Sequence, residues 1–249
     1  QRVDDLIASV GEISLDSEAR ILEAEKAVSQ LEEKEQKQLD NLALLQEARA
    51  KYNRLLVENV EALITAIGTV TLDSADAIQT AGKGYASLDA SLQPEVGNYA
   101  ELQAAEEAYR MAQVDEIREA IAVIGTVTLD SGEAIASARA VYEKYDSDIQ
   151  AAVDNYDLLT AAEDTLLNLR AEQVISMIDA IGTVTLDSKE AIDKAQSALR
   201  ALTNEEKNRV TNADVLTQAG ATYRELEKAA KKQASLDEAR SLIRVTGIW

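Results

Sequence analysis

Four evenly spaced aspartates are the residues of this sequence whose type and spacing most suggest chemistry. The phrase around them occurs three times as GTVTLDS and once as GEISLDS, at residues 68–74, 125–131, 182–188 and 11–17. In one copy, Asp73, Ser74 and Asp76 would offer oxygen ligands to a divalent cation. Calcium-binding loops place several oxygen ligands at short alternating intervals, and this phrase does not. We therefore expect no metal site, and a structural role for the phrase.

Helix capping explains the phrase without a ligand. Gly68 is the usual residue type for the left-handed position just past a helix end. The next four residues alternate polar and apolar, as in an extended segment, which would direct Val70 and Leu72 together into the end of a helical bundle. Aspartate is a good N-cap, and an acidic residue three positions later completes a capping-box-like pattern, which the first copy lacks because it has Ala19. The predicted caps are Asp16, Asp73, Asp130 and Asp187.

Asparagine also recurs once per period, immediately before a helical stretch. An N-cap is again the plain interpretation. No copy lies in an Asn-x-Ser/Thr context, so a glycan is not indicated. The predicted caps of this second set are Asn41, Asn98, Asn155 and Asn212.

Tyrosines are the remaining candidates for ligand contact. Eight tyrosines, in a chain with no Phe and a single Trp, could form a stacking surface for sugars or peptides. Most of them recur at apolar helical positions, where partial burial is common for this residue type. Packing is therefore the main interpretation, and Tyr142 and Tyr145 keep a ligand-stacking alternative open.

The composition disfavours most catalytic chemistry. The chain has neither His nor Cys, which removes the commonest metal ligand and general base together with thiolate chemistry. Its carboxylates would need surroundings that separate their pKa values to act as an acid and base pair, and nothing in the pattern predicts such surroundings. We expect no catalytic residue, no cofactor and no enzyme. The net charge of −20 disfavours nucleic acid, and the lack of a long apolar run predicts no membrane insertion.

A strict internal period defines the predicted architecture. The interval between successive aspartates is constant, since 73 − 16, 130 − 73 and 187 − 130 all equal 57. Within one period, apolar residues recur at steps of three and four along three segments, which predicts three helices. No Gly or Pro separates the third helix from the first helix of the next period, in residues 41–67, 98–124 and 155–181. The sequence therefore predicts an all-α fold, an elongated rod of tandem three-helix bundles that share helices. An advance of about 15 helical residues per repeat would make the rod roughly 90 Å long.

The period also predicts the domain boundaries. The last copy differs from the others, because the similarity of Leu242, Ile243 and Gly247 to the start of the chain requires eight extra residues. We interpret this end as a lengthened helix and the start of a truncated fifth unit, and the chain as a piece of a longer array. The predicted units are residues 1–57, 58–114, 115–171, 172–228 and 229–249.

The repeat pattern resembles a known class of module. LITAIGTVTLDSADAI followed by NYAELQAAEEAY is similar to short helical repeats of large surface proteins of Gram-positive bacteria, including cell-wall-associated glycosidases and S-layer-type proteins, and the shared-helix plan is similar to spectrin repeats. The resemblance implies an extracellular place at the cell surface or cell wall, and a role as a spacer or lattice module. The alternative is an adhesive module that binds a cell-wall glycan or a partner protein through an exposed helix face. The expected partners are cell-envelope components or neighbouring protein modules, with lateral self-association left open.

Overall fold

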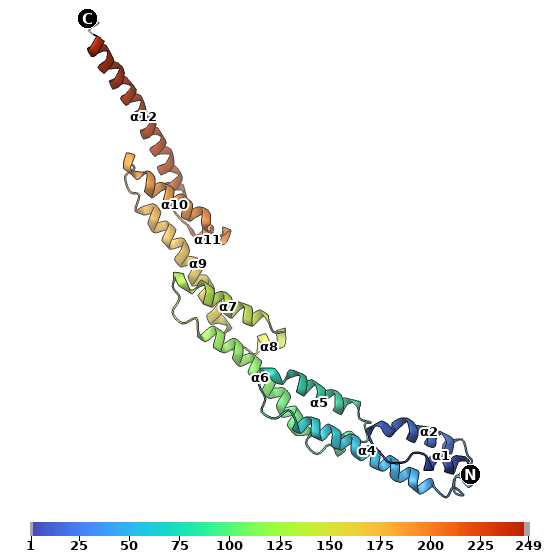
Figure 1. The fold of residues 1–249 in the computed structure, drawn as a ribbon. Helices are drawn as coiled ribbons and strands as arrows, with labels where there is room; N and C mark the ends of the chain where they lie inside the picture. The colour runs from blue at the N-terminus through green and yellow to red at the C-terminus, as the bar shows by residue number, and fades with distance from the viewer. Residues whose placement is uncertain (1, 247–249) are drawn as a thin grey trace. The chain divides into compact units, whose positions relative to one another are not determined.

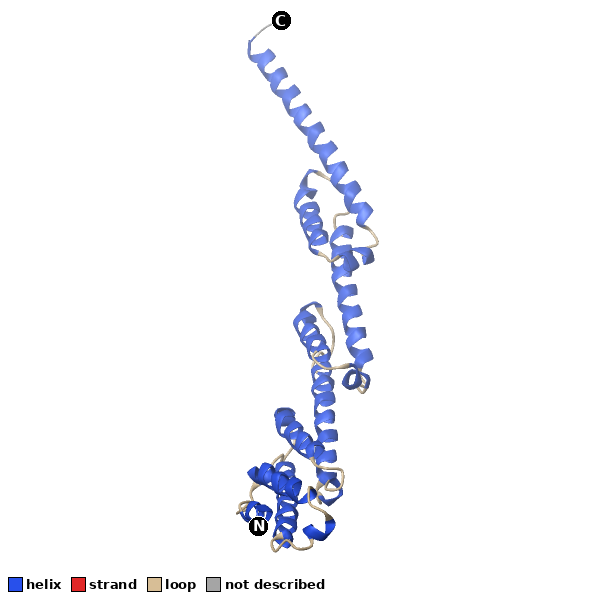
Figure 2. Cartoon of the chain, turned by 90° about the vertical axis from the view of Figure 1, so that its right-hand side faces the viewer, coloured by secondary structure: helices blue, strands red, loops and turns tan. Residues whose placement is uncertain are grey.

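The chain is all-helical. The computed structural model describes residues 2–246, and in this range it contains α-helices, short 3-10 helices and loops but no strand (Figure 2). The predicted all-α class is confirmed. No helix within residues 2–246 combines the length and the apolarity needed to cross a membrane.

The helices recur with the period of the sequence. Each copy of the phrase contains one turn of 3-10 helix, in η1 (Leu15–Ser17), η2 (Leu72–Ser74), η4 (Leu129–Ser131) and η5 (Leu186–Ser188). An α-helix follows each turn directly, in α2 (Glu18–Ser29), α5 (Ala75–Ser87), α7 (Gly132–Glu143) and α10 (Lys189–Ala201). The long helices begin one period apart, in α4 (Leu42–Thr65), α6 (Tyr99–Ala122), α9 (Tyr156–Asp179) and α12 (Ala213–Thr246). The predicted continuity from the third helix of one period into the first helix of the next is confirmed in α4, α6 and α9.

Contacts divide the chain into two compact units, Gln1–Asp115 and Glu116–Trp249. The first unit begins with α1 (Arg2–Ala8) and also holds α3 (Glu33–Gln36), η3 (Gln93–Glu95) and the first part of α6. In Figure 1 its helices α2 and α5 lie beside α4, as their contacts confirm.

One helix of the first unit serves two apolar cores. The first core joins α1, α2 and the first half of α4, where Leu45 and Tyr52 are buried. The second core joins the end of α4, where Val60 and Ile64 are buried, to α5 and to the start of α6. Leu56 packs against both cores. The unbroken backbone of α4 therefore carries side chains of two successive repeats.

The second unit repeats this arrangement along α9. This helix contacts α7 on one side of the repeat boundary, and α10, α11 (Asn204–Arg209) and α12 on the other. Leu159 and Leu166 are buried in its first half, and Val174 and Ile178 belong to the core that α9 forms with α10 and α12. The short α8 (Ser147–Ala151) lies between α7 and α9 in the sequence.

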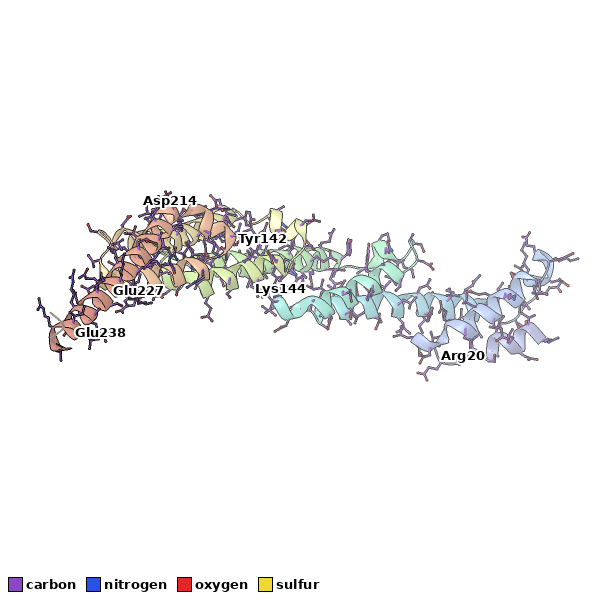
Figure 3. All side chains as sticks on the ribbon, turned by 90° about the horizontal axis from the view of Figure 1, so that it is seen from above. Arg20, Tyr142, Lys144, Asp214, Glu227 and Glu238 are labelled. Atoms are coloured by element: carbon purple, nitrogen blue, oxygen red, sulfur yellow. The ribbon has the colours of Figure 1, made fainter. Side chains whose placement is uncertain are left out.

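The last helix is longer than its counterparts. α12 has 34 residues, against 24 in α9, so the predicted lengthening is confirmed. Its first turns pack through Leu216 and Ala219, whereas Leu242 and Ile243 are exposed. The side chains of Glu227 and Glu238 stand out from the later turns of this helix (Figure 3). Gly247, part of the predicted fifth unit, lies outside the described residues.

Candidate functional site

The phrase begins with the predicted left-handed glycine. Its four copies have φ angles of 65, 61, 59 and 56°, at Gly11, Gly68, Gly125 and Gly182. A Cβ added at Gly68 would meet no heavy atom within 4 Å. The constraint at this position is therefore the backbone conformation, which other L-residues adopt only at a cost.

Of the two apolar residues that follow the glycine in the second copy, only one is packed into the bundle. Val70 packs against the core of the second repeat, as predicted. Leu72 is 38% exposed, so the prediction that it plugs the bundle with Val70 is wrong. The reason is that η2 begins at Leu72, which ends the alternation of an extended segment after a single inward side chain.

The predicted aspartate caps are wrong, because each aspartate lies inside a 3-10 turn, and the α-helix that follows the turn has the next residue, a serine, at its N-cap position. In the second copy the extended residue before η2 is Thr71, whose Oγ1 accepts a hydrogen bond from the backbone N–H of Asp73 at 3.3 Å. The Oγ of Ser74 accepts one from the backbone N–H of Thr71 at 2.9 Å. A capping box therefore forms between Thr71 and Ser74, and Asp73 supplies only a backbone donor. The same correction applies to Asp16, Asp130 and Asp187.

The first copy has the capping box that its sequence was expected to lack. Ser14 takes the place of the threonine, and its backbone N–H donates to the Oγ of Ser17 at 2.9 Å. Arg20, labelled in Figure 3, adds a hydrogen bond from its guanidinium to the same Oγ at 3.1 Å. Ala19 is thus irrelevant to the cap. A search for Ser or Thr three residues before Ser would have found all four boxes.

The asparagines precede the long helices as predicted, but their side chains do not cap them. Asn41 and Asn155 occupy the N-cap positions of α4 and α9 without a side-chain cap hydrogen bond. Instead, each amide Nδ2 donates to the backbone carbonyl oxygen 37 residues earlier in the sequence. The distances are 3.1, 3.0, 3.1 and 3.1 Å for the pairs Asn41–Asp4, Asn98–Glu61, Asn155–Arg118 and Asn212–Ile175. The prediction is therefore right about the N-cap position of Asn41 and Asn155 and wrong about the bond made there, because the amide is used to join two helices.

These hydrogen bonds measure the step from one repeat to the next. Along α4, one such bond is made by Asn41 and the next is accepted by Glu61. The two bonds are therefore 61 − 41, or 20, residues apart along the helix. Along α9 it runs from Asn155 to Ile175, and 175 − 155 is again 20. Twenty helical residues rise by about 30 Å. Each of these two steps is longer than the advance of about 15 helical residues expected from the sequence.

Tyr142 packs within its own repeat. Its ring stacks on the ring of Tyr156, with centroids 4.4 Å apart and an angle of 23° between the planes. The guanidinium of Arg139 lies over both rings and donates from Nη1 to the hydroxyl of Tyr156 at 3.2 Å. Nε and Nη2 of the same arginine bind Glu163, and this hydrogen bonding raises the pKa of Arg139 above its usual value. The ring of Tyr142 is therefore occupied by neighbours in the chain.

Tyr145 is held in a separate cluster. Its hydroxyl donates a hydrogen bond to the carboxylate of Glu116, and this bond lowers the pKa of Glu116. Lys144, labelled with Tyr142 in Figure 3, lies over the ring of Tyr145 and binds Glu116 at 2.9 Å. The two tyrosines singled out from the sequence are thus not brought together into one stacking surface.

Two sets of charged contacts were not predicted from the sequence. One is a pair between the second and third helices of a repeat, formed by Glu25 and Arg49 in the first repeat. In the third repeat the same two positions carry Arg139 and Glu163, so the charges are exchanged. Both pairs are separated by 24 residues, and this shared spacing was the available signal.

The other missed contact is a buried carboxylate, Glu206, which is 2% exposed. It accepts hydrogen bonds from the backbone N–H of Thr203 at 2.7 Å and from Arg170 at 3.0 Å. Burial alone would raise the pKa of Glu206, but the bonds from Thr203 and Arg170 together lower it. The capping-box pattern Thr-x-x-Glu at this position was readable from the sequence.

The repeated residues described above pack the cores, cap the helices and join one helix to another. Within residues 2–246, no group of three or more Asp, Glu, His or Cys residues is placed to hold a metal ion. Comparison with protein-family models, curated proteins and solved structures found no match for the chain. Its function is therefore inferred from the contacts described above.

Proposed function

We propose that this chain is a structural spacer or lattice module of a bacterial cell-surface protein, built as an elongated rod of tandem three-helix bundles that share helices. The observation that carries the proposal is the double use of α4, whose two halves pack in two successive cores. A helix common to two cores leaves no flexible linker between them. Distance held by continuous backbone is the property that a spacer needs.

The repeated contacts support a spacer more than an adhesive module. The capping boxes, the left-handed glycines and the asparagine bonds occur in all four repeats, and each of them serves the backbone. The two tyrosines considered for ligand stacking make their contacts within the chain. The location at a bacterial surface rests on the resemblance of the repeat phrase alone.

Small-angle X-ray scattering of the whole chain tests the rod. Three steps of about 30 Å, followed by the 34 residues of α12, would give a length of about 140 Å. A thin rod of this length has a radius of gyration of about 40 Å, whereas a compact globule of this chain length has one of about 18 Å. A measured value near that of the globule would refute the proposal.

A matched pair of variants tests whether helix continuity maintains the length. Glu107 lies in the middle of α6 and is exposed. Glu107→Pro removes a helix hydrogen bond and kinks or breaks the helix, so the radius of gyration should fall and the maximum dimension should shorten. Glu107→Ala keeps the helix and should scatter like the unmodified chain. Equal scattering from both variants would show that the long helix does not set the dimension.

A further inference from the structure

The later turns of α12 are exposed although they carry an apolar pattern that is buried elsewhere in the chain. Every residue from Lys231 to Val245 is exposed, and in Figure 1 these turns extend beyond α10 and α11. Leu236, Ala239 and Ile243 follow one another at steps of three and four residues, so they lie on one face of the helix. Leu236 is 44% exposed.

The same spacing marks the helix end that enters the next core in each earlier repeat. The buried residues of α4 and α9 at this spacing belong to the core of the following repeat, where they meet its second and third helices. The structure therefore shows what covers such a face, which is a pair of helices like α5 and α6. The buried sets are Val57, Val60 and Ile64 in α4, Val114, Ile117 and Ile121 in α6, and Ala171, Val174 and Ile178 in α9.

The first repeat has such a helix pair with one position of its core unfilled. Val57 and Val96 belong to one core in the second repeat. In the first repeat α1 begins at Arg2, after the position equivalent to Val57. Leu39, the counterpart of Val96, is accordingly only half-buried. The residues at this position are buried in all later repeats, as Val96, Val153 and Val210.

The apolar face of α12 matches this site in register. Leu242 and Ile243 repeat the pair Leu6 and Ile7 of α1, which lies 236 residues earlier. With this offset Ile243 corresponds to the buried Ile7, and Leu236 corresponds to the missing counterpart of Val57. The helix that is too long at one end of the chain therefore carries the side chain that the core at the other end lacks.

The charge of these turns also favours a second copy as the partner. From Lys231 to Arg244 the basic residues outnumber the acidic ones, whereas the whole chain has 45 Asp and Glu against 25 Lys and Arg. The acidic surface of a second copy therefore attracts this part of α12. Two α12 helices packed on each other would instead bring two basic segments together.

We propose that the later turns of α12 dock on the first repeat of a second copy of this chain, where they displace α1 and pack against α2 and α4. Ile243 takes the place of Ile7, and Leu236 covers Leu39. Exchange of equivalent elements between copies is a low-cost route to association. The two surfaces differ, so the contact builds end-to-end chains and not closed dimers. This inference uses the packing seen in α4 and does not depend on a place at the bacterial surface.

Sedimentation equilibrium of the full chain at increasing concentration tests the contact. The average mass should rise beyond that of two chains. Leu236→Glu should lower the association constant by about tenfold to a hundredfold, because a leucine is no longer buried. Val245→Glu is the matched control, since Val245 is 83% exposed and lies on the opposite side of the helix, and it should associate like the unmodified chain. The mass of one chain at every concentration, or equal losses from both variants, would refute the proposal.

A variant of α1 tests the displacement. Ile7 is buried beneath α2 and α4, so Ile7→Ala weakens the docking of α1 and leaves α12 unchanged. Association should then become stronger by about tenfold or more. A mass that stops at two chains, or a folded Ile7→Ala variant with unchanged association, would overturn the inference in favour of contact between two α12 helices. If Ile7→Ala unfolds the first repeat, the limiting mass and the two α12 variants decide, because both α12 positions are exposed.

Discussion

Replacing Asn98 by aspartate distinguishes a helix cap from a bond between helices. Asparagine and aspartate are about equally good N-caps, so a capping role predicts a change in unfolding free energy below about 0.5 kcal/mol. In the structure, Nδ2 of Asn98 donates to the carbonyl oxygen of Glu61 at 3.0 Å and to Oγ1 of Thr65 at 3.2 Å. Aspartate has no amide donor at this place. The two roles therefore predict different results for one substitution.

The expected loss follows from these contacts. A net contribution of about 1 kcal/mol per hydrogen bond gives about 2 kcal/mol for the two bonds. A carboxylate oxygen would also face the carbonyl oxygen of Glu61 across a hydrogen-bonding distance, which adds repulsion. We expect Asn98→Asp to destabilise the chain by about 2–3 kcal/mol. Asn98→Ala should cost less, because it also removes Oδ1, which is buried and meets no donor within the described part of the chain.

Urea unfolding followed by far-ultraviolet circular dichroism measures both variants against the unmodified chain. The urea concentration at the unfolding midpoint should be highest for the unmodified chain, lower for Asn98→Ala and lowest for Asn98→Asp. Raising the salt concentration should leave most of the aspartate effect in place, since lost hydrogen bonds are not screened. A midpoint for Asn98→Asp at or above that of Asn98→Ala would refute the bond between helices and restore the cap.

Five further substitutions test three other features of the structure by urea unfolding. Gly68→Ala should destabilise the chain by about 1–2 kcal/mol because φ is positive there, while Gly82→Ala, inside α5 and without a close neighbour at its Cβ, should stabilise it by about 0.5–1 kcal/mol. Thr71→Ala should cost about 1 kcal/mol through loss of the capping box, and Asp73→Ala only a few tenths through the helix dipole. Glu206→Gln should cost about 1 kcal/mol at pH 7. The pKa of Glu206 is lowered in the folded chain, so its carboxylate stabilises the fold above its unfolded pKa of about 4.3, and this stabilisation is lost as the pH falls further. Near pH 2 the unmodified chain should therefore have lost the advantage over Glu206→Gln that the carboxylate charge gives it at pH 7.

Each of these expectations has a result that contradicts it. Equal losses at the two glycines would mean that backbone conformation is not the constraint at Gly68. A larger loss for Asp73→Ala than for Thr71→Ala would return the cap to the aspartate. An unchanged difference between Glu206→Gln and the unmodified chain from pH 7 to pH 2 would show that the carboxylate charge contributes nothing.

The helices were predictable because their signal is local. Apolar steps of three and four residues, and the lack of Gly and Pro between Asn98 and Ile124, depend only on neighbours in the sequence. The left-handed conformation of Gly68 was predictable for the same reason, since few other residues adopt it. These features need no knowledge of which helix faces which.

The caps were predicted at the wrong residues because several adjacent side chains qualify. Thr71, Asp73 and Ser74 all favour N-cap positions, and the choice depends on where the first turn begins. The 3-10 turn at Leu72 moves that beginning two residues earlier than the aspartate would require. Propensity alone contains no information about this short turn.

The asparagine bonds and the exchanged ion pairs were beyond the reach of local patterns. The bond between Asn98 and Glu61 spans 37 residues, and the pairs at Arg49 and Arg139 span 24. Both require knowing which faces of two helices meet. A period in the sequence reveals that such positions are equivalent between copies, but not that they touch.

The features that all four repeats share cannot make one repeat act differently from another. The left-handed glycine, the capping box and the asparagine bond occur in every copy. They therefore explain the repeated fold, and they cannot explain a property that belongs to one repeat. Among the packed positions that vary are those of the tyrosine pairs and of the charged pairs beside them. If one repeat binds a partner, the difference must arise at positions that vary, and at one such pair the second and third repeats carry stacked tyrosines. The first repeat carries Val28 and Leu42 there, and the fourth carries Leu199 and Ala213.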